Sequence, residues 1–168
     1  EARIAMIMLD TVDWPIVFLG ALRAGVVPVA LNTLLTTEQY AYVLEDSRAQ
    51  VLFVSAALYP VILPILSDAN AGLRVVVVGD HVPGRPTLAH LLEGEDNHFA
   101  SARTFRDEPA FWLYSSGSTG MPKGVKHVHS SLAATAEAFG HGIMGLREDD
   151  VCHSAAKLFF AYGLGNSL

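Results

Sequence analysis

Apolar and polar positions form two kinds of pattern along the chain. Apolar runs with few polar interruptions predict buried strands at residues 3–9, 26–31, 51–55 and 74–79. Between the first two runs, apolar residues from Trp14 to Leu22 follow helical spacing, with Pro15 in the first turn and Gly25 after the end. Strands that alternate with helices at this spacing predict an α/β fold with mostly parallel sheets flanked by helices.

Two further segments carry helical signals. Thr36 and Gln39 predict a capping box at the start of a helix. Residues 56–69 have helical spacing, but Pro64 removes a backbone donor in their middle, so we expect an interrupted helix there.

A polar segment divides the chain. Residues 80–109 are rich in proline, glycine and acidic residues, and we expect a connection there with a short helix at 88–92. The pattern then predicts a strand at 111–114, a helix that starts near Ser130 and a strand at 150–155. The expected organisation is a first α/β lobe with its connection at 1–109 and the start of a second α/β lobe at 110–168.

Composition and charge exclude several partners. The formal net charge of -6 gives no basic face for nucleic acid or anionic lipid. Residues 49–67 carry no charge, but Pro60 and Pro64 indicate a strand and an imperfect helix, not a membrane span. We therefore expect no nucleic acid and no membrane as partner, and a homo-oligomer is left open. Small-molecule substrates and a cytoplasmic location are expected from the resemblance described below.

Cys152 is the single cysteine, which excludes an internal disulfide framework and a multi-thiolate metal site. We expect it to be a small apolar residue in the strand at 150–155, with His153 as its structural neighbour. The chain begins at Glu1 and runs at once into a predicted strand, so we expect the natural start to precede it.

The stretch YSSGSTGMPKGV, residues 114–125, concentrates small donors and one cation. Glycine lets a backbone approach a ligand, hydroxyl groups donate hydrogen bonds and a lysine supplies charge, so the stretch predicts a phosphate-binding loop. It is not a Walker A loop, because Pro122 stands at the position of the second glycine and Gly124 follows Lys123. The dinucleotide fingerprint and the hydrolase elbow are also absent.

Residues 115–124 resemble the phosphate-binding signature S/T-S-G-S/T-T-G-x-P-K-G of the adenylate-forming superfamily, which includes acyl-CoA synthetases, luciferases and adenylation domains of peptide synthetases. The resemblance implies that this loop contacts the β- and γ-phosphates of ATP. The implied nucleotide-binding residues are Ser116, Gly117, Ser118, Thr119, Gly120, Lys123 and Gly124. Lys123 and Thr119 are the expected catalytic residues, and Ser115 is left outside the set because its side chain could face the core.

The chemistry of that superfamily is an acyl activation. A carboxylate attacks the α-phosphate of Mg-ATP, pyrophosphate leaves, and the acyl adenylate passes its acyl group to a thiol. The resemblance thus implies an ATP-dependent, AMP-forming acid-thiol ligase that uses ATP, Mg2+ and CoA. Such a protein mainly neutralises the leaving group and orients the carboxylate. We expect no metal ligands in this chain, since His127 and His129 lack a carboxylate at ligand spacing.

A second resemblance lies in LFFAYGLGNS, residues 158–167. In acyl-CoA synthetases the comparable stretch often reads LFHxYG, and Phe160 stands here in place of the histidine. The resemblance implies that Phe160, Ala161, Tyr162 and Gly163 bind the acyl substrate. A small residue beside a flat aromatic ring suits an aryl group. The whole chain resembles benzoate-CoA ligases, which implies benzoate as the substrate, although a ligase for a substituted benzoate would look nearly the same.

The resemblance covers the whole chain but only the early and middle part of the superfamily's large N-terminal domain. It implies that the adenine, ribose and magnesium sites and the C-terminal domain lie beyond Leu168, so we expect this segment alone to be inactive. Two other hypotheses stay open. The chain could belong to a non-catalytic nucleotide-binding fragment, or to an adenylation domain that loads a carrier protein.

Overall fold

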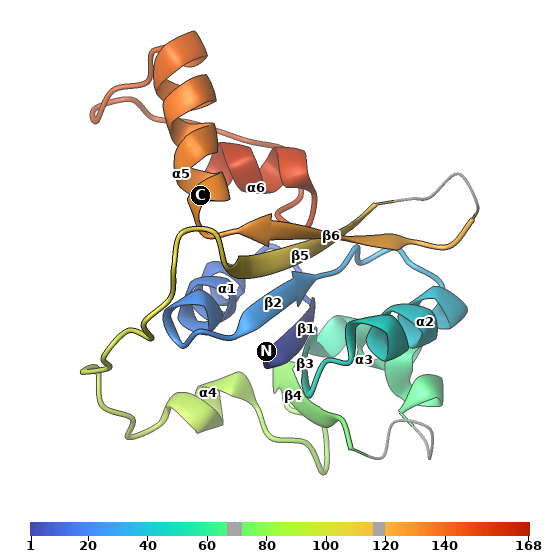
Figure 1. Cartoon of the computed structure of the whole chain (residues 1–168). Coiled ribbons are helices and arrows are strands. Elements are labelled where there is room, and N and C mark those ends of the chain that lie inside the picture. The colour runs from blue at the N-terminus through green and yellow to red at the C-terminus, as the bar shows by residue number, and fades with distance from the viewer. Residues whose placement is uncertain (67–71, 116–119) are drawn as a thin grey trace.

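One sheet organises the chain, and the computed structural model describes it at residues 1–66, 72–115 and 120–168 (Figure 1). The strand order is β4-β3-β1-β2-β5-β6. The strands are β1 (Arg3–Ile7), β2 (Val27–Ala30), β3 (Val51–Ser55), β4 (Arg74–Val78), β5 (Pro109–Ser115) and β6 (Lys123–Val128). Every neighbouring pair is parallel except β5 and β6, which are antiparallel. The expected fold class, α/β with a mostly parallel sheet, is confirmed.

Helical elements cover both faces of this sheet. They are α1 (Asp13–Arg23), α2 (Thr37–Ser47), η1 (Ala56–Leu58), α3 (Tyr59–Ile62), η2 (Leu63–Ile65), α4 (Leu88–Leu92), α5 (Ser130–Thr135), the π-helical continuation η4 (Ala136–Met144) and α6 (Ala161–Ser167). One core contains residues of α2 and α3, and the other contains residues of α1 and α6. Successive residues of β4 alternate between the two, since Val75 and Val77 lie in the first core and Val76 and Val78 in the second.

The local signals of the first hundred residues are confirmed. The side chain of Thr36 accepts a hydrogen bond from the Gln39 amide at 3.3 Å, and the Gln39 side chain accepts one from the Thr36 amide at 3.0 Å. The short helix expected at 88–92 is α4. Around Pro64 the expected helix is broken into η1, α3 and η2, and residues 67–69 of the expected range lie outside the described residues.

The strand expected at 150–155 is wrong. Residues 151–155 have no regular secondary structure, and Cys152 and His153 are exposed. An apolar alternation becomes a strand only where a neighbouring strand pairs with its backbone, and the structure gives this segment none among the described residues. Cys152 is therefore not the buried strand residue that its composition suggested.

The sheet continues across residue 109. Val29 pairs with Trp112 and Ala30 with Leu113, which joins β5 to β2 in parallel. The division into lobes at 1–109 and 110–168 stays a prediction about a larger protein.

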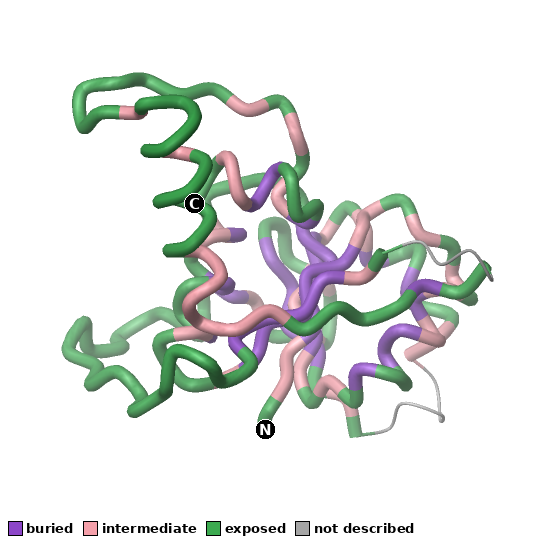
Figure 2. The backbone as a smooth tube through the Cα atoms, turned by 45° about the horizontal axis from the view of Figure 1, so that its top comes forward, coloured by how far each residue is buried: buried purple, intermediate pink, exposed green. Residues whose placement is uncertain are grey.

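The helix formed by α5 and η4 projects from the sheet (Figure 1) and is mostly exposed (Figure 2). Ile143 and Met144, both apolar, lie near its end and are exposed. None of the helices in the described part of the chain combines the length and the apolar character that a membrane crossing requires.

Candidate functional site

The β5–β6 hairpin presents the predicted phosphate loop at one edge of the sheet. Ser115 pairs with Lys123 and Tyr114 with Gly124, so the two ends of the loop lie side by side. Because β1, β2 and β5 are parallel, their carboxyl ends meet at this edge, where ligands bind in open α/β sheets. Four of the predicted loop residues, Ser116, Gly117, Ser118 and Thr119, lie outside the described residues.

The described end of the loop suits an anion. Lys123 is exposed on β6 and has no carboxylate partner among the described residues. Gly120 has a φ of +91°, which other residues rarely adopt, and Pro122 is buried beside it. Ser115 is exposed rather than core-facing, so the reason for leaving it outside the predicted set does not hold.

Two aromatic residues of β5 support the base of the hairpin. Trp112 is buried, with the guanidinium carbon of Arg3 at 5.2 Å and the ammonium of Lys126 at 5.0 Å from its ring centre. The hydroxyl of Tyr114 donates to a carboxylate oxygen of Asp46 at 2.5 Å. Burial, and then the hydrogen bond to Asp46, raise the pKa of Tyr114, which keeps the phenol protonated. Sequence reasoning missed these contacts.

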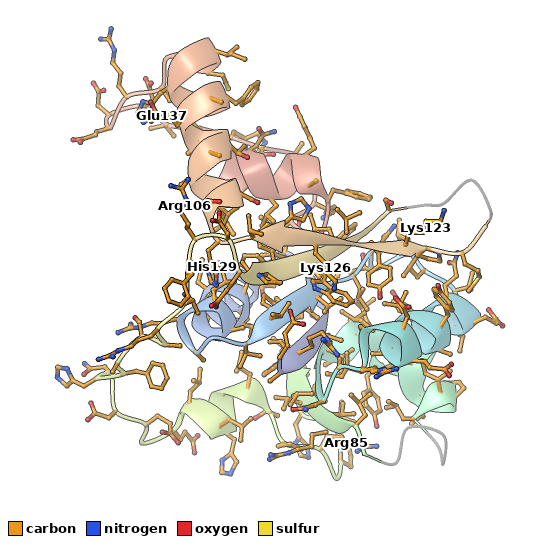
Figure 3. The ribbon with its side chains drawn as sticks, viewed as in Figure 1. Arg85, Arg106, Lys123, Lys126, His129 and Glu137 are labelled. Carbon is orange, nitrogen blue, oxygen red and sulfur yellow. The ribbon has the colours of Figure 1, made fainter. Side chains whose placement is uncertain are left out.

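The two histidines that follow the loop in the chain, His127 and His129, both make contacts within the fold. His127 lies in β6 and stacks on Phe111, with ring centres 4.7 Å apart, and burial lowers its pKa. His129 lies at the opposite end of β6 from Lys123, next to α5 (Figure 3). Its amide donates to the carbonyl of Glu108 at 3.2 Å. Among the described residues, no group of three or more histidine, cysteine or carboxylate side chains could hold a metal ion.

The predicted substrate segment lies at the start of α6. Phe159 is buried in the core, whereas Phe160 and Tyr162 are 48% and 72% exposed, so the two phenylalanines divide between core and surface. Ala161 is also exposed, and Gly163 is buried. Tyr162 lines a hollow of about 560 Å³ between η4, residues 152–156 and α6, but the other three predicted substrate residues do not. The four predicted substrate residues, 160–163, are thus consecutive at the start of α6, but they do not line one common cavity.

Asp10 fastens this segment to the edge of the sheet that carries the loop. Asp10 follows β1, and its carboxylate lies 3.6 Å from the ammonium of Lys157. It also accepts a weak hydrogen bond from the amide of Leu158 at 3.4 Å. The turn before α6 is therefore docked at the carboxyl end of β1. Sequence reasoning missed Asp10, although its place directly after an apolar strand was a usable signal.

Gly163 is needed for the geometry of this turn. A Cβ atom at this position would lie 2.1 Å from the carbonyl oxygen of Lys157. The same carbonyl accepts a hydrogen bond from the amide of Phe160 at 3.1 Å, and Phe160 in turn accepts one from Leu164 at 2.8 Å. The backbone of α6 thus lies directly against the turn that precedes it.

Comparison with known proteins identifies relatives along the whole chain. Residues 1–168 match the family of AMP-binding enzymes. The chain is 55% identical over 168 residues to a 4-hydroxybenzoate–CoA/benzoate–CoA ligase of Rhodopseudomonas palustris. This match covers all of this chain and 31% of that protein. Two solved structures are similar. A benzoate CoA ligase from Burkholderia xenovorans LB400 has a TM-score of 0.88 at 46% identity, over 100% of this chain and 32% of that one. The anthranilate CoA ligase AuaEII, solved with anthranoyl-AMP, has a TM-score of 0.94 at 34% identity, over 98% of this chain and 32% of that one.

We predict that Gly163→Ala destabilises the fold by about 1–3 kcal/mol, because the added methyl group must displace the backbone at Lys157. Urea unfolding measures the loss. Gly165→Ala is the matched control on the same helix, since its nearest atom, in Thr135, lies 3.4 Å away. Equal effects of the two substitutions would contradict the steric role of Gly163.

Proposed function

The chain belongs to the AMP-binding enzyme family, and from this premise we propose that it is part of a ligase that activates an aromatic carboxylate with ATP and joins it to CoA. The chain spans about 31% of the length of the Rhodopseudomonas palustris relative. The activity therefore belongs to a longer protein, of which this segment supplies the phosphate hairpin and one side of the acyl site. Benzoate is the substrate we propose.

The observation that carries this proposal is the arrangement at one edge of the sheet. The hairpin ends, Ser115 and Lys123, lie at the carboxyl edge of the parallel strands, and the turn that leads into α6 docks at the end of β1 on the same edge. An anion cradle and an aromatic segment on one edge suit a reaction between a nucleotide phosphate and an aryl carboxylate. Relatives that act on benzoate, 4-hydroxybenzoate and anthranilate support the aromatic class.

Each proposed role follows from the chemistry of its residue. The Lys123 ammonium binds the β- and γ-phosphates of ATP and stabilises the charge that develops on pyrophosphate as it leaves. Thr119 and the serines at 116 and 118 would donate further hydrogen bonds to the phosphates, and Gly120 and Gly124 let the backbone approach. The described residues offer no cluster of Mg2+ ligands, so we assign the metal no ligand among them.

The acyl side of the proposed site is less polar than the phosphate side. Phe160, Ala161 and Tyr162 form an exposed aromatic and small-residue surface at the start of α6. Such a surface can hold an aryl ring by stacking and edge contacts, with Gly163 keeping the turn close. In the reaction, a carboxylate oxygen attacks the α-phosphate, the bond to pyrophosphate breaks, and the thiol of CoA then displaces AMP from the acyl adenylate.

A panel of carboxylates, assayed on the complete protein with ATP, Mg2+ and CoA, tests the proposal. We expect benzoate-dependent pyrophosphate release and benzoyl-CoA formation, with hydroxybenzoates and aminobenzoates as the next best substrates. Acyl transfer to a carrier protein instead of CoA would favour an adenylation domain. No release with any carboxylate would favour a non-catalytic nucleotide-binding protein.

Lys123→Ala is expected to lower the rate of acyl adenylate formation about 100-fold or more, because one charged donor to the leaving group is lost. Carboxylate-dependent exchange of pyrophosphate into ATP measures this step. Lys126→Ala is the matched control, since it removes the same charge from the same strand. A rate with Lys123→Ala equal to that of the control would exclude Lys123 from the phosphate site.

Ala161→Leu is expected to raise the KM for benzoate about tenfold while the KM for ATP stays unchanged, because extra carbon atoms would occupy the space of the ring. Steady-state kinetics with each substrate varied in turn separates the two constants. If both constants rise by the same factor, Ala161 does not contact the acyl group.

A further inference from the structure

A short hydrogen bond joins the phosphate hairpin to a helix that is distant in sequence. Tyr114 lies one residue before the end of β5, and Asp46 lies in the last turn of α2, 68 residues earlier. The 2.5 Å separation of their oxygens is at the short end for a hydroxyl that donates to a carboxylate. Burial and the hydrogen bond to Asp46 raise the pKa of Tyr114, so its phenol stays protonated at physiological pH.

The position of Asp46 does not serve its own helix. A carboxylate in the last turn of a helix faces the negative end of the helix dipole, which disfavours it. Asp46 also forms no ion pair in the part of the chain that the structure describes. Its defined partner there is the Tyr114 hydroxyl, so its contribution is to the hairpin.

The ring of Tyr114 transmits this attachment to the loop end of β6. Tyr114 pairs with Gly124, and a Cβ atom on Gly124 would lie 3.3 Å from the Cζ atom of Tyr114 and 3.3 Å from the Trp112 ring. The two aromatic rings therefore lie against the bare backbone of Gly124. Lys123, the proposed phosphate ligand, is its direct neighbour in the chain.

The strand β6 has little else to hold it at this end. Within the described part of the chain it is the outermost strand of the sheet and pairs with β5 alone. Lys123, Gly124 and Val125 are all exposed. The position of this backbone therefore depends on its hydrogen bonds to β5 and on the rings beneath Gly124.

We propose that Tyr114 and Asp46 are positioning residues for the phosphate site: their hydrogen bond holds the Tyr114 ring against Gly124 and thereby sets the position of Lys123. This inference rests on the proposed function, because Lys123 binds phosphate only there. It assigns a role in ATP use to a helix, α2, that carries none of the predicted site residues.

The test uses the complete ligase with Tyr114→Phe, which removes only the hydroxyl, and Asp46→Ala, which removes its acceptor. Two half-reactions are measured separately: pyrophosphate exchange into ATP, and transfer from added benzoyl adenylate to CoA. We expect the KM for ATP in the first to rise about tenfold in each variant. The KM for benzoate and the second half-reaction, which do not need the pyrophosphate site, stay unchanged.

Two controls define the interpretation. Glu45→Ala removes a carboxylate from the same turn of α2 that forms no ion pair among the described residues, and it should leave both half-reactions unchanged. The double variant Tyr114→Phe/Asp46→Ala should be no worse than either single variant, since all three lack the same bond. Additive effects, an unchanged KM for ATP, or an equal fall in both half-reactions would overturn the positioning role.

Hydrogen exchange separates this inference from the proposed function. Amides in residues 120–128 should exchange at least about threefold faster in Tyr114→Phe than in the wild type, whether or not the protein has ligase activity. If the wild type shows no carboxylate-dependent exchange of pyrophosphate, the proposed function is wrong. If hydrogen exchange of these amides is the same in Tyr114→Phe as in the wild type, the hydrogen bond does not position the hairpin, whatever the ligase activity.

Discussion

The parallel pairing of β5 with β2 is the constraint on which the rest of the structure depends. It joins Val29 to Trp112 and Ala30 to Leu113 across more than eighty residues of chain. Because all parallel strands point the same way, this pairing brings the end of β5, with Ser115, to the edge at which β1 ends before Asp10. The β5–β6 hairpin and the docked turn of α6 lie on one edge for that reason.

Side chains on both faces hold β5 in this place. On one face Phe111 continues an aromatic series in which Trp14 stacks on Phe18 at 4.9 Å, Phe18 meets Phe111 edge-on at 5.4 Å, and Phe111 stacks on His127. On the other face Trp112 lies beneath the cations of Arg3 and Lys126. The series links α1 to β6 through β5, so the hairpin is supported from the core as well as from its backbone.

Several apolar side chains are exposed in the part of the chain that follows the hairpin. The projecting helix of α5 and η4 leaves Ile143 and Met144 in solvent, and Val151 is 98% exposed. The chain spans about 31% of the length of the Rhodopseudomonas palustris relative. At the proposed acyl site, α6 offers an aromatic surface, and the hollow beside it includes Tyr162 but not Phe160.

Local chemistry made much of the fold predictable. Apolar runs marked β1 to β4, the Thr36 and Gln39 pair marked the start of α2, and Pro64 marked the break in the following helix. These signals depend on neighbours within a few residues, so the order of the chain contains them. The predicted strand at 150–155 failed because a strand also requires a partner, and an apolar alternation does not say whether one exists.

The sequence by itself determined which residues have the chemistry for a phosphate loop and an aromatic site, since glycine, hydroxyl, lysine and aromatic side chains keep their character in any fold. Only the tertiary structure decided how they are held. Asp46 lies against Tyr114, Asp10 against the turn before α6, and the Lys157 carbonyl where a side chain on Gly163 would stand. Such contacts join residues that are brought together by the order of the strands in the sheet. That order cannot be read from the spacing of residues in the sequence.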